Sequence, residues 1–328
     1  MQRRQFIAGL ASAAAAWPQP ARAQTGRMPR IGVLLPLAEN DPEQIARRAG
    51  LLQGLERLGW SDGRNVRIDY RYAGGADRFA PLAKEMVASQ PDVIFVNSSG
   101  FVTAVHRETR TIPIVFVNVS DPIGAGFVSS LARPGGNLTG LLLFEATVVG
   151  KWLSMLKEMA PRVTRAAVMA NPKTTLYDYF LRSAEAAAPS LGIELVPSRV
   201  ESAADIERAI ESIARAPDGG LVVVPDSTMA RNRNLIVDLA ARHRLPAVYP
   251  ERFYATAGGL MSYGIAELIE PFRQAASYID RILKGEKPGD LPVQAPTRYS
   301  TILNLKTAKA LGLTVPPGLL VAADELIE

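Results

Sequence analysis

The sequence contains no cysteine among its 328 residues. This absence excludes disulfide bonds, cysteine-ligated metal sites, a thiol nucleophile and a lipid-modified N-terminal cysteine. Histidine is nearly absent as well, since only His106 and His243 occur, and both fall within expected helices. Two such histidines indicate neither a metal cluster nor a Ser-His-Asp triad. We therefore expect no metal site, no cofactor and no catalytic residue.

Nucleotide-binding and hydrolase motifs are also missing. No G-x-x-x-x-G-K-[ST] loop and no G-x-S-x-G elbow are present. Blocks of five or six like charges are absent, so nothing indicates a nucleic-acid partner. The net charge of +5 includes three arginines in residues 1–23, a segment without acids, so the rest of the chain carries +2. The sequence pI of about 9.5 is therefore a weak argument for nucleic-acid binding.

The N-terminal residues have the composition of an export signal. Arg3 and Arg4 precede an apolar run from Phe6 to Trp17, and Ala21-Arg22-Ala23 forms an A-x-A cleavage pattern. This run is shorter than the ~20 residues that span a bilayer. We expect a signal peptide over residues 1–23, cleaved between Ala23 and Gln24, and a periplasmic location. A twin-arginine signal and an ordinary secretion signal both fit the two arginines.

Downstream, short apolar runs alternate with helical patterns, and this order occurs twice. Asp41-Pro42 predicts the N-cap and first residue of a helix that ends at Leu58, and a further helix is expected over 228–244. Runs such as Val93–Val96 and Leu221–Val224 predict parallel strands covered on both faces. The repeat predicts an α/β fold with two doubly wound parallel-sheet lobes. Elements after residue 256 are too few for a third domain, so we expect a three-segment hinge. The expected lobes are residues 28–139 plus 257–291, and residues 140–256 plus 292–328.

The strand ends of such sheets are where ligands bind. Small hydroxyls there favour a carboxylate ligand beside helix N-termini, and acids such as Asp226 or Glu251 favour an ammonium group. Helix capping is the alternative role for each Ser, Thr or Asp after a strand. The candidate ligand-binding residues are Leu37, Asn40, Ser98, Ser99, Phe101, Asp121, Asn171, Thr175, Tyr177, Asp226, Ser227, Tyr249 and Glu251.

Several patches resemble one known family. They are Thr111–Phe116, Ser120-Asp121-Pro122, Leu131–Gly140, Asp280–Pro288, Asn304–Leu313 and Ala323–Ile327. Together they resemble the ABC-transporter substrate-binding protein family that is related to bacterial tryptophan-binding receptors. The resemblance implies a periplasmic-binding-protein fold of type I, as in leucine and ribose receptors. It also implies delivery of a small molecule to a membrane permease driven by a separate ATPase subunit.

The expected function is therefore that of an extracytoplasmic solute-binding component of an ABC importer. Relatives with known ligands bind aromatic amino acids, so the expected ligand is an amino acid or another small carboxylate. A sensory subunit that presents a ligand to a membrane kinase has the same fold and remains an alternative. A secreted hydrolase is a further alternative, although no histidine follows an expected strand. We expect a monomer with no nucleic-acid partner.

Overall fold

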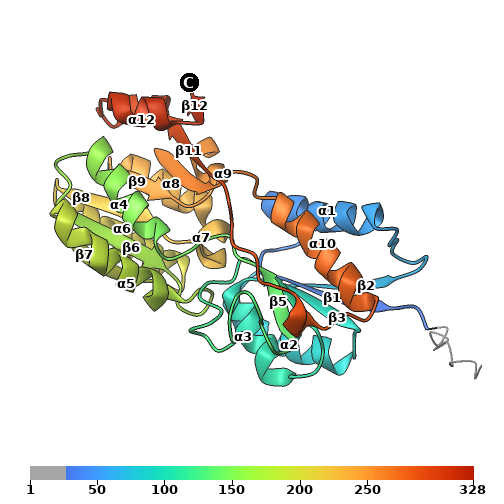
Figure 1. Cartoon of the computed structure of the whole chain (residues 1–328). Helices are drawn as coiled ribbons and strands as arrows, with labels where there is room; N and C mark the ends of the chain where they lie inside the picture. Colours follow the sequence, from blue (N-terminus) through green and yellow to red (C-terminus); the bar gives the residue numbers. More distant parts are fainter. Residues whose placement is uncertain (1–26) are drawn as a thin grey trace, which may run out of the picture.

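The computed structural model describes residues 27–328, which form two α/β lobes joined by three chain segments (Figure 1). The predicted signal peptide, residues 1–23, lies outside the described residues. Across residues 27–328, no helix is long and apolar enough to cross a bilayer. The fold class predicted from the repeat, two parallel-sheet lobes with a three-segment hinge, is confirmed.

The first lobe contains a five-stranded parallel sheet in the order β2-β1-β3-β4-β5. Helices α1 and α10 cover one face, and α2 and α3 cover the other. The strands are β1 (Arg30–Leu35), β2 (Arg67–Tyr72), β3 (Val93–Asn97), β4 (Ile114–Val117) and β5 (Leu138–Leu141). The helices are α1 (Pro42–Arg57), α2 (Phe79–Ala88), α3 (Ser99–Glu108) and α10 (Glu270–Leu283), with 3-10 turns at Ala76–Arg78 and Pro288–Asp290.

The second lobe contains a seven-stranded sheet in the order β12-β11-β10-β9-β8-β6-β7. All neighbours are parallel except β10 and β11. The strands are β6 (Arg165–Ala170), β7 (Glu194–Arg199), β8 (Gly219–Val223), β9 (Ala247–Tyr249), β10 (Met261–Ile265), β11 (Tyr299–Asn304) and β12 (Glu325–Ile327). The helices are α4 (Val148–Met159), α5 (Tyr177–Ala187), α6 (Ala203–Ala214), α7 (Ser227–Arg231), α8 (Arg233–Arg242), α9 (Arg252–Thr256), α11 (Leu305–Ala310) and α12 (Pro317–Ala322), with a 3-10 turn at Ala188–Leu191.

The chain crosses between the lobes at residues 142–147, 266–269 and 295–298. These positions differ from the predicted boundaries at 139/140, 256/257 and 291/292. Each strand completes its pairing before the chain crosses: Leu141, the last residue of β5, pairs with Val117, and Ile265, the last residue of β10, pairs with Tyr299. The predicted first-lobe segment 257–291 is thus divided, because β10 belongs to the second sheet while α10 packs on α1.

Helix α1 begins where the sequence predicts, with Asp41 as its N-cap. The Asp41 carboxylate accepts a hydrogen bond from the Glu43 backbone N–H at 2.9 Å, which satisfies one free donor of the first turn. A single helix predicted over 228–244 is instead two helices, α7 and α8, that meet at Asn232. The Asn232 side chain donates to the Thr228 carbonyl at 2.8 Å, and such side-chain bonding competes with a continuous helix.

Glycine allows α1 and α10 to approach closely at Gly54. A Cβ atom there would lie 2.5 Å from the Arg273 carbonyl oxygen and 2.7 Å from the Ala276 Cβ. No side chain larger than hydrogen fits unless the two helices separate. The close packing of α10 on α1 fixes the end of the second crossing segment, which leads into α10.

We predict that Gly54→Ala lowers the free energy of unfolding by about 1–3 kcal/mol, the usual cost of overpacking a tight contact. Gly150→Ala in α4 is the matched control, because its Cβ would meet only the Ala187 Cβ, at 3.4 Å. That substitution should be neutral or stabilising by up to about 1 kcal/mol. Urea denaturation of both variants measures the difference. Equal stability of the two variants would contradict the packing argument.

Candidate functional site

The two lobes are in direct contact at the carboxyl ends of their strands. The Gly100 N–H donates to the Thr174 carbonyl at 3.3 Å, and the Ser120 and Thr175 hydroxyls lie 3.4 Å apart. Leu37, which follows β1, is fully buried in the hydrophobic cluster of the second lobe. The first-lobe residues in these contacts follow β1, β3 and β4, so the contacts join the lobes along several strands of the first sheet. The structure is therefore a closed form.

Two arginines of the second lobe add polar contacts across the same interface. Arg233 forms an ion pair with Asp41 at 2.9 Å, and both side chains are largely shielded from solvent. Arg231 donates to the Gly74 carbonyl oxygen, which follows β2. Since Asp41 caps α1, the ion pair links the first turn of α1 to the start of α8.

Backbone strain is concentrated in the first-lobe loops at this interface. Ser98, Asn118 and Asp121 have φ angles of 107°, 62° and 41°, in the region that favours glycine. Ser98 directly follows β3, and the other two follow β4. Residues in such conformations are held there by surrounding contacts, and they cluster at binding sites and switch regions.

Most first-lobe candidates from the sequence make contacts within the protein. The Ser98 hydroxyl accepts from the Phe101 N–H at 3.4 Å, and the Ser99 hydroxyl accepts from the Ser120 N–H at 2.9 Å. Phe101 is a core residue that stacks on Phe79, with ring centroids 4.1 Å apart. The Asp121 carboxylate is half-buried and accepts a hydrogen bond from the Gly124 N–H. Asn40 is exposed.

Asp226 is the N-cap of α7 and the centre of a buried hydrogen-bond group. One carboxylate oxygen accepts from the Met229 N–H at 2.8 Å. The other accepts from the Asn171 N–H at 3.3 Å and from the Thr174 hydroxyl. Burial is the main reason that the pKa of Asp226 is raised to about 6, and these hydrogen bonds oppose the shift. Both carboxylate oxygens of Asp226 thus have hydrogen-bond partners within the protein. Ser227 follows as the first residue of α7 and is partly buried.

The aromatic candidates of the second lobe lie in its core. The Tyr177 hydroxyl donates to the Val168 carbonyl at 2.8 Å and accepts from the Ser198 N–H at 3.0 Å. Tyr249 stacks on Tyr254, with ring centroids 4.9 Å apart. These two tyrosines, with Phe253, form an aromatic group next to the loop after β9.

A second set of buried polar groups lacks partners within the described part of the chain. Besides the Tyr70 and Ser262 hydroxyls and His106 Nδ1, the unpaired atoms are Gln44 Nε2, Arg47 Nε, both side-chain amide atoms of Asn97, Glu251 Oε2 and the Tyr254 hydroxyl. Burying a polar group without a hydrogen bond costs about 1–3 kcal/mol, and a charged group costs more. Gln44, Arg47 and Asn97 belong to the first lobe and Glu251 and Tyr254 to the second, and the charge of Arg47 acts on Glu251 across the lobe interface.

Only Glu251 of these five residues is among the candidates read from the strand ends. Asn97 is the last residue of β3 and directly precedes the candidate Ser98. Tyr254 lies in α9. Gln44 and Arg47 lie inside α1, where the strand-end rule does not apply. One pattern in the sequence could have indicated them. Gln44 and Arg47 are polar residues spaced three apart, and they share the buried face of α1 with Gly50, Leu51 and Leu55.

Glu251 has the most perturbed carboxyl group at the interface. Its side chain is 4% exposed, and burial raises its pKa to about 8. The positive charge of Arg47 opposes that shift, whereas the carboxylates of Glu43 and Asp226 add to it. The interface therefore combines a buried carboxyl group of the second lobe, Glu251, with a buried guanidinium of the first lobe, Arg47. In residues 27–328 no cluster of histidines and acids is suited to hold a metal ion.

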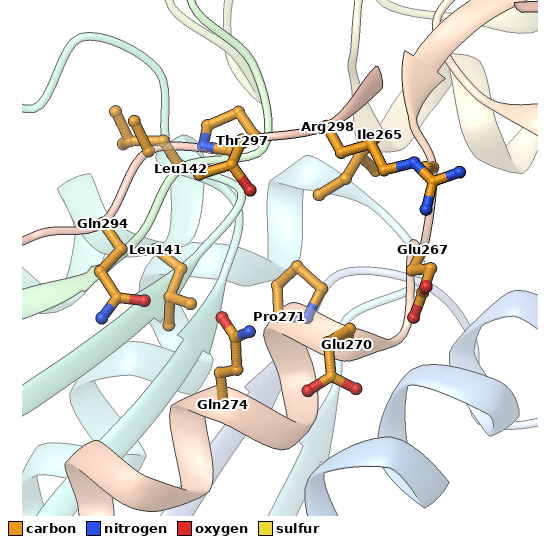
Figure 2. Close-up of a pocket in the computed structure, with 13 residues that line it drawn as sticks. Leu141, Leu142, Ile265, Glu267, Glu270, Pro271, Gln274, Gln294, Thr297 and Arg298 are labelled. Carbon is orange, nitrogen blue, oxygen red and sulfur yellow. The ribbon is translucent and has the colours of Figure 1, made fainter. Parts of the chain in front are cut away.

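A separate groove runs along the hinge, with a volume of about 330 Å³. Figure 2 shows its residues around the first turn of α10, with Glu270 and Gln274 from that helix and Glu267 and Arg298 from two crossing segments. Leu141 and Ile265 supply apolar surface. Unlike the lobe interface, this groove is lined by none of the described buried side chains that lack partners.

Comparisons with known proteins agree with this architecture. The family profile described as ABC transporter substrate binding protein matches residues 30–327. A tyrosine-binding protein of Clostridioides difficile is 26% identical over 267 residues, which are 81% of this chain and 76% of that protein.

Two solved structures share the fold. A Streptococcus pneumoniae domain in complex with L-Trp has a TM-score of 0.83 at 24% identity, over 92% of this chain and 100% of that one. A ligand-free, open substrate-binding protein with adhesive properties from Clostridium difficile has a TM-score of 0.64 at 26% identity, over 91% and 99%. The lower TM-score with the open protein is consistent with the bridging contacts between the lobes of this chain.

We predict that Glu251→Gln flattens the pH dependence of stability. The unfolded carboxyl loses its proton near its ordinary pKa of 4.5, whereas the folded one keeps it up to about 8. The folded state therefore binds more protons in this window, and the free energy of unfolding falls as pH rises through it. Glutamine does not titrate, so urea denaturation between about pH 6 and 8 should show a smaller fall in the variant. Identical slopes for both proteins would contradict the assignment.

Proposed function

Since the chain belongs to the ABC transporter substrate-binding protein family, we propose that it is the extracytoplasmic binding component of an ABC importer. It captures an amino acid or a similar small carboxylate between its lobes. It then presents the closed, loaded form to a membrane permease that a separate ATPase subunit drives. Proteins of this kind close around a ligand by a hinge motion, and the three crossing segments supply such a hinge.

The observation that carries this proposal is the set of unpaired polar groups at the lobe interface. Arg47 and Asn97 come from the first lobe and Glu251 from the second, and all three are nearly or fully buried. A ligand that bonds to both lobes at once stabilises the closed form and therefore shifts the population toward it. The same contacts would make the loaded form recognisably different from the open one.

The relatives support an amino acid as the ligand. The Clostridioides difficile relative is named a tyrosine-binding protein, at 26% identity. The aromatic group of Tyr249, Phe253 and Tyr254 packs in the core of the second lobe beside Glu251, and the unpaired Tyr254 hydroxyl adds a polar group there. We propose binding rather than catalysis, because His106 lies against Phe127 and His243 ends α8, both away from the interface residues.

We also propose that residues 1–23 are a signal peptide and that the mature protein acts in the periplasm. The two adjacent arginines, the apolar run and the A-x-A pattern support export.

A thermal-shift screen of mature protein, residues 24–328, tests the proposed function. The panel contains amino acids, aromatic acids, sugars and nucleosides. A ligand at ~100 times its dissociation constant should raise the free energy of unfolding by about 2.7 kcal/mol. We expect a shift with at least one amino acid or small carboxylate. No shift with any compound, in protein that has first been unfolded and refolded to remove bound solute, would contradict a binding role.

The ion pair between Arg233 and Asp41 supports a second prediction. The two side chains meet only when the lobes close, so Arg233→Ala should disfavour the closed form and weaken ligand binding. Loss of a largely shielded pair of this kind costs roughly 1–2 kcal/mol, which corresponds to about a 5- to 30-fold rise in Kd by titration calorimetry.

Arg252→Ala is the matched control. Its ion pair with Glu325, at 2.6 Å, lies within the second lobe and is exposed, so lobe closure does not change it. That variant should keep the affinity of the unmodified protein. Equal affinities for the Arg233 and Arg252 variants would show that the interlobe pair does not contribute to binding.

A further inference from the structure

Arg47 is the most unusual charged residue in the described chain. Its side chain is 3% exposed, its Nε atom is buried without a hydrogen-bond partner, and it forms no ion pair with any residue of 27–328. The guanidinium lies over the Phe272 ring, whose centroid is 5.9 Å from the Arg47 Cζ. A cation–π contact of this kind is far weaker than the cost of removing a guanidinium from water. Arg47 therefore needs an anion that the protein does not supply.

Two further donors lie on the same side of the first sheet. Side chains alternate along β3, and Val93 and Phe95 belong to the core on the α1 and α10 face, so Asn97 points to that face as well. The Gln44 side chain accepts from the Leu37 N–H at 3.3 Å through Oε1, which leaves its Nε2 group to donate. The first lobe thus directs amide and guanidinium donors to one place, which suits a carboxylate.

The second lobe presents acceptors instead. Glu251 Oε2 and the Tyr254 hydroxyl are buried and unpaired. Both groups sense the same charges, because the Glu251 carboxylate raises the pKa of Tyr254 and Asp226 contributes to the shift of both. A carboxylate with a free oxygen beside a phenolic hydroxyl suits an ammonium group, which offers three donors and no acceptor.

The Arg47 guanidinium and the Glu251 carboxyl lie close together without direct contact. No ion pair within 4.0 Å joins Arg47 and Glu251, although Arg47 is close enough to lower the pKa of Glu251. A guanidinium of the first lobe and a carboxyl group of the second thus lie near each other without an ion pair. A molecule that carries its own negative and positive groups satisfies both.

We propose that Arg47 and Glu251 are the two charged contacts of one ligand, an α-amino acid-type zwitterion. The first lobe, through Arg47, Gln44 and Asn97, binds its carboxylate, and the second lobe, through Glu251 and Tyr254, binds its ammonium group. This inference rests on the proposed function. It adds that tight binding requires both charges of the ligand and that each lobe binds one of them.

Ligand analogues test this division of roles by titration calorimetry at pH 7.5. The probes are the twenty proteinogenic L-amino acids, followed by the deaminated acid and the decarboxylated amine of the tightest binder. For L-tyrosine these are 3-(4-hydroxyphenyl)propionate and tyramine. Each analogue should bind at least about 10- to 100-fold more weakly than the amino acid, as expected for loss of one charge-assisted hydrogen bond. An analogue that binds as tightly as the amino acid overturns the proposal.

Two variants assign each charge to its residue. Arg47→Gln should lose the preference for the amino acid over the amine and keep the preference over the deaminated acid. Glu251→Gln should show the reverse. Arg281→Gln is the control, because it removes an exposed ion pair with Glu286 at the end of α10 and should bind as the unmodified protein does. Loss of both preferences to the same extent in both variants overturns the assignment.

Proton release gives a readout that a purely structural role would not produce. Below about pH 8, the Glu251 carboxyl holds a proton, and an arriving ammonium group favours its ionised form. The groups that face it are Arg47 and Glu43 from α1, Asp226 after β8 and Tyr254 in α9. Calorimetry at pH 7 in phosphate and in Tris should show a proton released on binding by the unmodified protein, and a much smaller release by Glu251→Gln.

The possible outcomes separate the two proposals. If sugars or nucleosides bind and no amino acid does, the solute-binding function stands and the zwitterion proposal is wrong. If no compound binds, the proposed function itself fails. If either variant does not fold, as judged by circular dichroism, the analogue series and the proton release of the unmodified protein still decide the question.

Discussion

A guanidinium that is taken out of water needs an anion, and this requirement organises the lobe interface. Arg47 is almost completely buried by the closed arrangement, and the described chain offers it no carboxylate. The same arrangement buries Glu251 on the opposite lobe with a raised pKa. The two groups come from different lobes, so a ligand that contacts both must join the lobes. Compensation by a ligand therefore links binding to closure.

The fold places these two groups through ordinary packing. The glycine contact at Gly54 holds α10 against α1, and Phe272 of α10 supports the guanidinium from below. On the other lobe, β9 is short and ends at Tyr249, which allows the following loop to direct Glu251 at the interface. The Arg233 ion pair with Asp41 then connects the first turn of α1 to the second lobe. Recognition and closure thus use the same helix.

The sequence was sufficient for the repeat, the lobe number and the N-terminus of α1, because these depend on local periodicity and capping. It missed β5, a four-residue strand, since so short an apolar run has no periodicity to detect. The lobe boundaries were misplaced because the pairing of β10 depends on non-local contacts. The strand-end rule includes Glu251 among its candidates, but it cannot point to Arg47, which lies inside α1 and packs on Phe272 of α10.

The central claim is that one ligand is held by Arg47 of one lobe and Glu251 of the other. A crystal structure of the protein with the amino acid that binds most tightly tests it most directly. The account predicts the ligand carboxylate within hydrogen-bonding distance of the Arg47 guanidinium and the ammonium group within the same distance of the Glu251 carboxylate. A ligand bound elsewhere, or one whose carboxylate is held by the second lobe while Arg47 stays unpaired, would contradict it.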